Sequence, residues 1–168
     1  MKTTLLALVA CIAMLNVADT AAAKEKKTTA SSGHEAVMLT PDQVKWVDAP
    51  PALPKGAQLA VLQGDPSKKG LFAIRFKMPD GYKIPPHWHT NTEELTILSG
   101  TFMLGIGDNF DEASMHSLAP TAYHYLPGKK HHYAMAKGET VLEIHGIGPF
   151  EIHYLNPAED PTKKSAAK

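Results

Sequence analysis

Apolar and polar residues alternate in short runs between residues 59 and 155, and this pattern predicts β-strands. In the stretch 71–78 the even-numbered residues from Phe72 to Met78 are large and apolar, whereas Arg75 and Lys77 between them are charged. The stretch 101–106 repeats the alternation, with Phe102, Leu104 and Ile106 expected on one side. A period of two residues is typical of a strand that has one buried face.

The predicted strands are short, and turn residues separate them. They cover residues 59–62, 71–78, 95–98, 101–106, 123–126, 131–135, 141–147 and 150–155. Clusters of Gly, Pro, Asp and Ser stand between them, including a turn expected at residues 99–100. One helical turn is expected at Pro41, because prolines 50, 51 and 54 end it quickly. Many short strands at near-regular spacing predict an all-β sandwich or barrel.

The two ends of the chain differ from this central region. Lys2, the apolar run 5–15 and the alanines at 21–23 follow the order of a secretory signal peptide, so we expect residues 1–23 to be removed on export. Residues 8–11 also resemble a lipoprotein box, but the apolar run continues past Cys11, so we expect no lipid anchor there. We predict a flexible lead-in at 24–35, one β-domain at 36–155 and a flexible tail at 156–168.

Charge and cysteine content narrow the possible functions. The chain has 17 basic and 17 acidic residues, so no net charge favours nucleic acid, and the apolar run near the start is too short to span a membrane. Motifs for phosphate binding or a serine nucleophile are absent. Cys11 is the only cysteine and would leave with the signal peptide. A metal site in the mature chain must therefore use histidine and carboxylate.

Residues 81–100 and 127–132 carry such groups. His87 and His89 are two residues apart, so an extended chain points both to one side and Trp88 to the other. Alternation sends only one of Glu93 and Glu94 to the histidine side, and only one of His131 and His132, without choosing between them. Imidazole and carboxylate together suit Fe, Mn, Ni, Zn, Co or Cu rather than Ca or Mg. The alternative is a polar, solvated strand face.

The spacing in this region resembles the first motif of the cupin superfamily. Gly81 is followed after five residues by His87, after one by His89, after three by Glu93 and after six by Gly100. Of the second cupin motif only the interval from Pro127 to His132 remains, because Thr121, Lys129 and Ala136 replace its two glycines and its asparagine. The resemblance implies a single-domain jelly-roll β-barrel with little helix. It also implies one divalent transition metal, held by His87, His89, Glu93 and His132, with His132 favoured over His131.

The resemblance implies a class of function rather than a reaction. We expect an exported, periplasmic or secreted enzyme that acts on a small organic molecule, of dioxygenase or isomerase type; the alternative is a non-catalytic module that binds a sugar or effector. Glu143 and His145 share a strand face, and with Tyr125 they are candidates for further pocket groups. The expected partner is a small molecule, and a homodimer is possible by resemblance to relatives.

Overall fold

The protein is described here from a computed structural model, which covers residues 36–165. The predicted signal peptide and lead-in, residues 1–35, lie outside the described residues, as do residues 166–168. The strands are β1 (Val47–Asp48), β2 (Gln58–Gln63), β3 (Gly70–Met78), β4 (Lys83–His89), β5 (Glu93–Ile106), β6 (His116–Leu118), β7 (Tyr123–Leu126), β8 (His132–Gly148) and β9 (Ile152–Tyr154). The helices are the 3₁₀ turns η1 (Pro41–Gln43) and η2 (Glu112–Ser114), and α1 (Pro161–Ser165).

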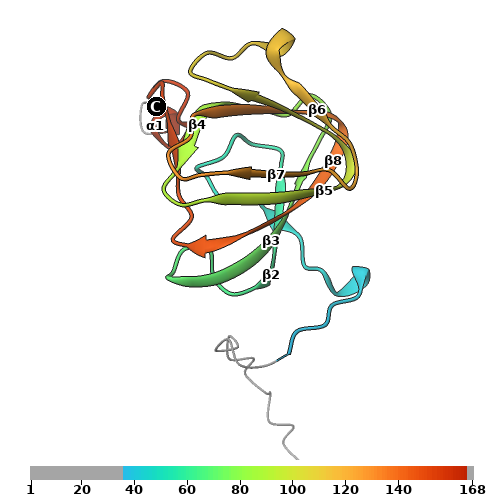
Figure 1. Cartoon of the computed structure of the whole chain (residues 1–168). Coiled ribbons are helices and arrows are strands. Elements are labelled where there is room, and N and C mark those ends of the chain that lie inside the picture. The colour runs from blue at the N-terminus through green and yellow to red at the C-terminus, as the bar shows by residue number, and fades with distance from the viewer. Residues whose placement is uncertain (1–35, 166–168) are drawn as a thin grey trace, which may run out of the picture. The chain divides into compact units, whose positions relative to one another are not determined.

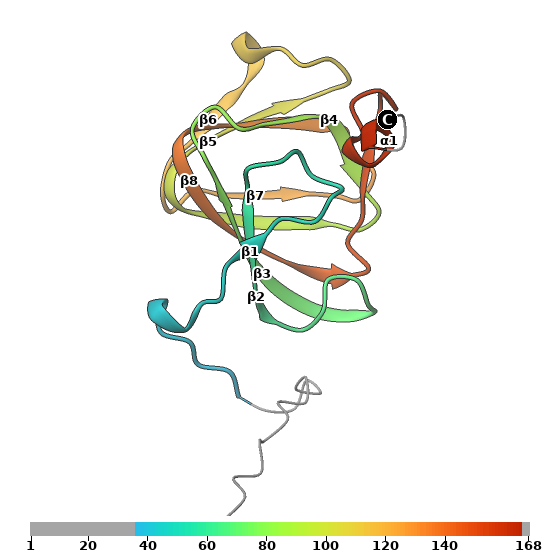
Figure 2. The ribbon, with the colours of Figure 1, turned by 180° about the vertical axis from the view of Figure 1, so that it is seen from behind.

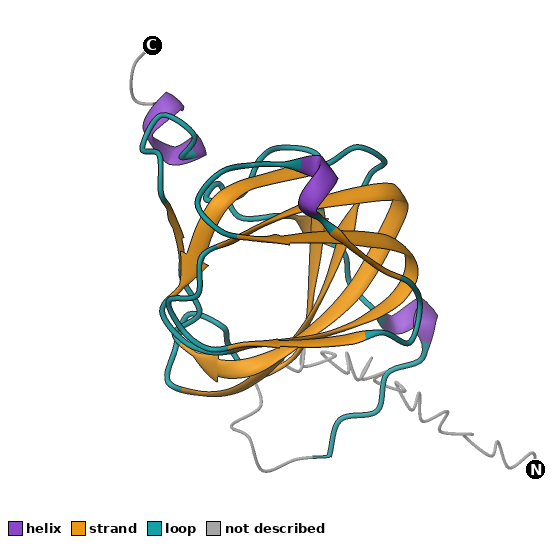
Figure 3. Cartoon of the chain, turned by 45° about the horizontal axis from the view of Figure 1, so that its top comes forward, coloured by secondary structure: helices purple, strands orange, loops and turns teal. Residues whose placement is uncertain are grey.

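The strands form one antiparallel sheet that curls into a barrel (Figures 1 and 2). Its order is β1-β2-β3-β8-β4-β9, and β5 pairs with β8 and also with β6 and β7. The long strands β5 and β8 pair along most of their length, from Glu94↔His145 to Ile106↔His132. The end of β8 also pairs with β3, and its beginning pairs with β4, so the bent strand joins two walls of the barrel. Figure 3 shows the strands curling around an interior. The predicted all-β fold with little helix is confirmed.

One predicted turn and one predicted break between strands are absent, because β5 and β8 continue through both positions. The chain bends at residues 99–100, and pairing with β8 resumes at Thr101 after two register shifts. Gly100 has a φ of 75°, and a Cβ there would lie 2.3 Å from the Glu139 carbonyl oxygen. The glycine therefore allows a sharp bend against β8 instead of a turn. Likewise, the predicted strands 131–135 and 141–147 are one strand.

The core follows the predicted alternation in β3, where Phe72, Ile74, Phe76 and Met78 are all buried. In β5, Phe102 and Leu104 are buried as expected. Ile106, which continues the alternation, is 42% exposed. It is the last residue of β5, and the chain leaves the sheet at Gly107, beyond the end of the core. The first ten residues of the predicted tail contain a turn and α1, and their flexibility stays a prediction.

Candidate metal centre

Four polar side chains from three strands meet inside the barrel. His87 and His89 come from β4, Glu93 is the first residue of β5, and His132 is the first residue of β8. His87 and His132 are direct partners in the β4–β8 ladder, and their ring centroids are 4.1 Å apart. All four side chains are buried, with exposed fractions of 2–8%. The structure thus brings together the four residues that the sequence predicted as ligands.

A register shift within β4 selects the inward residues. The shift falls between Ile84 and His87, where Pro85 and Pro86 lack the N–H groups that a regular ladder needs. After it, ordinary alternation puts His87 and His89 inside and Trp88 on the other side. The Trp88 ring stacks on His153 of β9, with centroids 4.0 Å apart. This contact fixes β4 from outside while the histidines face the interior.

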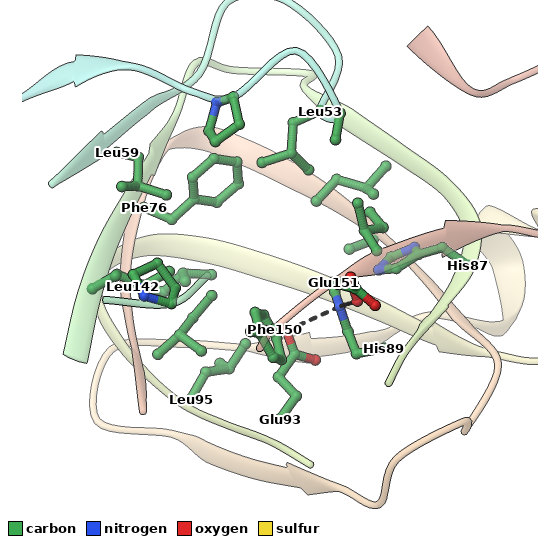
Figure 4. A pocket seen from close by; sticks show the side chains of 18 of the residues that line it. Leu53, Leu59, Phe76, His87, His89, Glu93, Leu95, Leu142, Phe150 and Glu151 are labelled. Atoms are coloured by element: carbon green, nitrogen blue, oxygen red, sulfur yellow. Dashed lines mark hydrogen bonds and ion pairs between the residues drawn. The ribbon is translucent and has the colours of Figure 1, made fainter. Parts of the chain in front are cut away.

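The histidines lie close enough to share one ion. Among the described residues, His87, His89 and His132 form a group whose ligand atoms all lie within 4.8 Å of one another. Glu93 Oε1 lies 3.6 Å from His89 Nε2, and its Oε2 lies 3.4 Å from His132 Nε2. Figure 4 shows His87, His89 and Glu93 at one side of the interior.

Backbone carbonyls determine which ring nitrogen faces the centre. The Nδ1 atoms donate to Pro85 O from His87 (2.7 Å), to Glu151 O from His89 (3.0 Å) and to Lys130 O from His132 (2.9 Å). Because a carbonyl only accepts, each neutral ring keeps its lone pair on Nε2. In the neutral forms, the ring lone pairs then face the Glu93 carboxylate, an arrangement that a cation stabilises. The donor set therefore fits a transition metal.

Burial and the contacts within the cluster shift the pKa values of all four proposed ligands. Burial lowers the pKa of His87 well below its ordinary value, and the nearby His132 and His89 add to this effect. Burial likewise lowers the pKa of His89. For His132 burial acts in the same direction, but its hydrogen bond and attraction to Glu93 outweigh it and raise the pKa. The pKa of Glu93 lies well below its ordinary value: burial opposes this, but the surrounding histidines outweigh it. His87, His89 and Glu93 are thus shifted toward the neutral imidazole and ionised carboxylate forms that bind metal, whereas the raised pKa of His132 means that a metal must compete with a proton there.

His124 of β7 is a further buried residue of this site that the sequence left unassigned. Its Nε2 lies 3.2 Å from Glu93 Oε2 and donates to it, because an ionised carboxylate only accepts. Its Nδ1 is buried and has no hydrogen-bond partner among the described residues. The only available signal was its position between Tyr123 and Tyr125, which the structure leaves exposed. His124 therefore donates to the same carboxylate oxygen that lies 3.4 Å from His132 Nε2.

The cluster borders a cavity of about 470 Å³. The polar residues of its lining are His87, His89, Glu93, His132, Glu151 and His153, and the remaining described lining residues are apolar. Glu151 and His153 were not predicted. Their side chains are 59% and 38% exposed, and the Thr90 hydroxyl lies between them, 3.1 Å from Glu151 Oε2 and 2.9 Å from His153 Nε2. These two residues are the polar groups of the wall that reach solvent.

The other sequence candidates lie elsewhere. Glu143 and His145 do share a strand face, but it is the outer one, where Glu143 pairs with Arg75 at 2.8 Å and with His145 at 3.1 Å. Tyr125 is 56% exposed on the neighbouring strand β7. None of the three is among the described residues that line the cavity, so we leave them out of the site. His131, the alternative to His132, is partly exposed and pairs with Asp108 at 2.8 Å.

Comparisons with known proteins agree with this architecture. The family model of the ChrR cupin-like domain matches residues 34–151. Similar solved structures include the polyketide cyclase RemF from Streptomyces resistomycificus, at 18% identity and a TM-score of 0.60, over 79% of this chain and 94% of that one. A putative acetylacetone dioxygenase from Methylibium petroleiphilum has 18% identity and a TM-score of 0.58, over 82% and 99%. An RmlC-like cupin from Shewanella frigidimarina has 15% identity and a TM-score of 0.53, over 72% and 96%. No curated protein sequence matches.

A curled antiparallel barrel with a histidine cluster in its interior defines a cupin. The family match covers most of the chain, so this protein belongs to the ChrR cupin-like domain family. The solved structures, all below 25% identity, support the fold alone. Within residues 36–165, no helix is long and apolar enough to cross a membrane.

Proposed function

We propose that this protein is an exported, metal-dependent cupin enzyme that acts on a small organic molecule by dioxygenase-type or isomerase-type chemistry. One observation carries the proposal: three imidazoles, each with Nδ1 bonded to a backbone carbonyl and Nε2 facing inward, converge with a carboxylate at one side of a largely apolar cavity. Such a set binds divalent transition metals, and a cavity of this size accepts a small molecule.

The proposed ligands are His87, His89, Glu93 and His132. A metal bound there supplies a Lewis acid or a dioxygen-binding centre. The protein's own residues do the rest: the backbone carbonyls orient the imidazoles, His124 orients Glu93, and the apolar wall excludes water from the reacting group. Two of the similar structures are named as a polyketide cyclase and a putative acetylacetone dioxygenase, and we carry that general class of activity to this chain as part of the proposal.

Metal analysis of protein purified without chelator tests the metal centre. We expect about one equivalent per chain, and His89→Ala should remove most of it while the fold remains. His145→Ala, which alters an exposed histidine, is the matched control and should keep the metal. Less than about a tenth of an equivalent in the wild type, with no uptake on reconstitution, would refute the proposal, since a site of this kind binds tightly.

Turnover separates an enzyme from a binding module. One observation favours the non-catalytic alternative: the described cavity wall has no buried acid or base apart from the four proposed ligands and their partner His124. Oxygen consumption and product formation over a panel of phenols, diketones and thiols, measured with metal-loaded protein, distinguish the two. Binding of panel members without turnover would favour the binding module.

Export and assembly are also part of the proposal. Expression of the full chain should yield a mature protein that begins at Lys24 outside the cytoplasm, as N-terminal sequencing of the exported fraction can show. An unprocessed chain that stays with the cytoplasmic fraction would contradict it. The homodimer is proposed from resemblance only, and light scattering of the purified protein tests it.

A further inference from the structure

The two sides of the cavity differ in chemistry. The proposed ligands come from β4 and from the first residues of β5 and β8. The other side is built by β2, β3 and the second half of β8, which contribute Leu59, Phe76 and Leu142. Figure 4 shows these three side chains across the interior from His87 and His89. A molecule that reaches the cluster therefore has its opposite end among apolar side chains.

The lining restricts what that opposite end can be. Among the described residues, no lysine or arginine lines the cavity, so a carboxylate or phosphate there would have no countercharge. Burying an unpaired anion costs several kcal/mol. No Ser, Thr, Asn, Gln or Tyr side chain is among the described lining residues either. Sugar hydroxyls away from the histidine cluster, Glu151 and His153 would therefore lose their hydrogen bonds to water without replacement.

We infer that the ligand is a small, largely apolar organic molecule that has one metal-binding oxygen group and no anionic group away from it. The oxygen group lies at the histidine cluster, and the apolar body lies against Leu59, Phe76 and Leu142. The position of the oxygen end rests on the proposed function, because it needs the metal. The inference that the rest of the ligand is apolar depends only on the residues of the cavity wall and not on the metal. Sugars and sugar phosphates are excluded as ligands that fill this cavity.

A loop closes part of the cavity and gives it a residue that selects ligands. Residues 50–54, which we call the strap, contribute Pro50, Ala52 and Leu53 to the wall. Two buried or half-buried tyrosines hold the strap: Tyr82 donates to Pro54 O at 2.5 Å and Tyr154 donates to Ala52 O at 2.9 Å. Leu53 is partly buried, lies on a loop that packs against the core, and lines the cavity. Leu53 is thus a specificity-determining position.

Two matched probes test the inference on the metal-loaded full chain. Benzoylacetone carries a chelating diketone and an apolar phenyl ring. 4-Acetoacetylbenzoate has the same diketone and a carboxylate at the far end of the ring. By calorimetry we expect the carboxylate to weaken binding at least tenfold, and glucose 6-phosphate to show no binding. Equal or tighter binding of the carboxylate probe, or binding of glucose 6-phosphate that benzoylacetone displaces, would overturn the inference.

A variant that introduces a positive charge into the cavity wall makes the test specific to the cavity. Leu53→Arg adds a cation to the wall and should raise the affinity for the carboxylate probe relative to benzoylacetone. Ala52→Arg is the second variant if the first does not fold. Leu71→Arg, at a residue that is 70% exposed outside the cavity, should leave the ratio unchanged. An unchanged ratio in both folded strap variants would contradict the proposed ligand position.

The result can be distinguished from failure of the proposed function. If the chain takes up no metal, the proposed function fails, and the same comparison on metal-free protein still tests the apolar wall. Preference for the neutral probe would then support the inference about the wall. If metal binds and the charged probe is preferred, the metal centre stands and the inference is wrong.

Discussion

At the residue scale, metal affinity should depend on how the Glu93 side chain is held between the histidines and His124. His124 is the residue that donates to this carboxylate from β7. Residues that orient a metal ligand in this way typically change metal affinity by about 10- to 100-fold. We predict that His124→Phe, which keeps a ring of similar size but removes the donor, lowers metal affinity by about that factor. Competition with a chromophoric chelator measures it.

If His124 only filled space, a variant that restores an N–H donor would not recover metal affinity. His124→Gln retains an N–H donor and should recover part of the lost affinity. His145→Phe changes an exposed histidine on the outer face and should have no effect. Equal affinities for the wild type and His124→Phe would show that the contact with Glu93 does not position the ligand.

Gly100 carries the second prediction at this scale. Its φ is positive, and a Cβ added to it would lie only 2.3 Å from Glu139 O, so both features oppose any side chain. We predict that Gly100→Ala destabilises the protein by roughly 2 kcal/mol or more, measured by urea unfolding. Gly81→Ala is the control, because Gly81 has a similar φ of 71° but open space around it. A loss no larger than that of the control would mean that the close approach has no energetic effect.

At the element scale, the tyrosines that hold the strap should make the stability of the folded protein decrease at alkaline pH. Burial raises the pKa of Tyr82 above its ordinary value of 10.0. The unfolded chain therefore loses its proton first as pH rises above 10, and the folded state is destabilised until its own pKa is reached. We predict that the urea midpoint falls above pH 10 and that Tyr82→Phe makes this fall shallower.

The same variant also removes a hydrogen bond at neutral pH. Tyr82→Phe should lower stability at pH 7 by about 1 kcal/mol, because the Pro54 carbonyl loses its donor. Tyr125→Phe, at an exposed hydroxyl, should change neither the neutral stability nor the alkaline slope. If both variants behave alike, the strap is not held by Tyr82.

Much of these elements can be predicted from the sequence, for identifiable reasons. Alternation identifies the inward face of β3 because Arg75 and Lys77 mark the outer one. In β8 it shows that Glu143 and His145 share a face but not that this face is outside, since Val141 and Ile147 there are apolar too. The bend at Gly100 resembles a turn, because a glycine with positive φ serves both.

The metal centre also contains some residues that can be predicted from the sequence and others that cannot. The inward direction of His87 and His89 follows from alternation, and the cupin spacing favours Glu93 and His132. His124 could not be predicted in this way, because a single inward polar residue on a strand produces no apolar period. Glu151 and His153 belong to neither motif. Their positions depend on which strands are neighbours. The pairing of β7 with β5 and of β9 with β4 is a property of the whole barrel.

At the scale of the whole molecule, metal binding and folding should be coupled, because the ligands come from three different strands. A ligand that binds only the folded state stabilises it by about 2.7 kcal/mol at a concentration 100 times its Kd. For a chain of this size, that corresponds to a Tm increase of roughly 5–10 °C. We predict such a shift when Zn²⁺ or Mn²⁺ is added to the chelator-treated protein, and its loss in His89→Ala. Mg²⁺ is the control and should give little shift, because it prefers oxygen ligands. Equal shifts with all three ions would indicate non-specific binding.

We propose above all that one transition metal is held inside the barrel by His87, His89, Glu93 and His132. Anomalous X-ray diffraction from crystals of the protein purified without chelator, recorded at the absorption edge of the metal it contains, tests this directly. We expect one strong peak at about 2.0–2.2 Å from the three Nε2 atoms and a Glu93 oxygen. A peak located elsewhere, such as beside His131 and Asp108, or no peak after reconstitution, would contradict it.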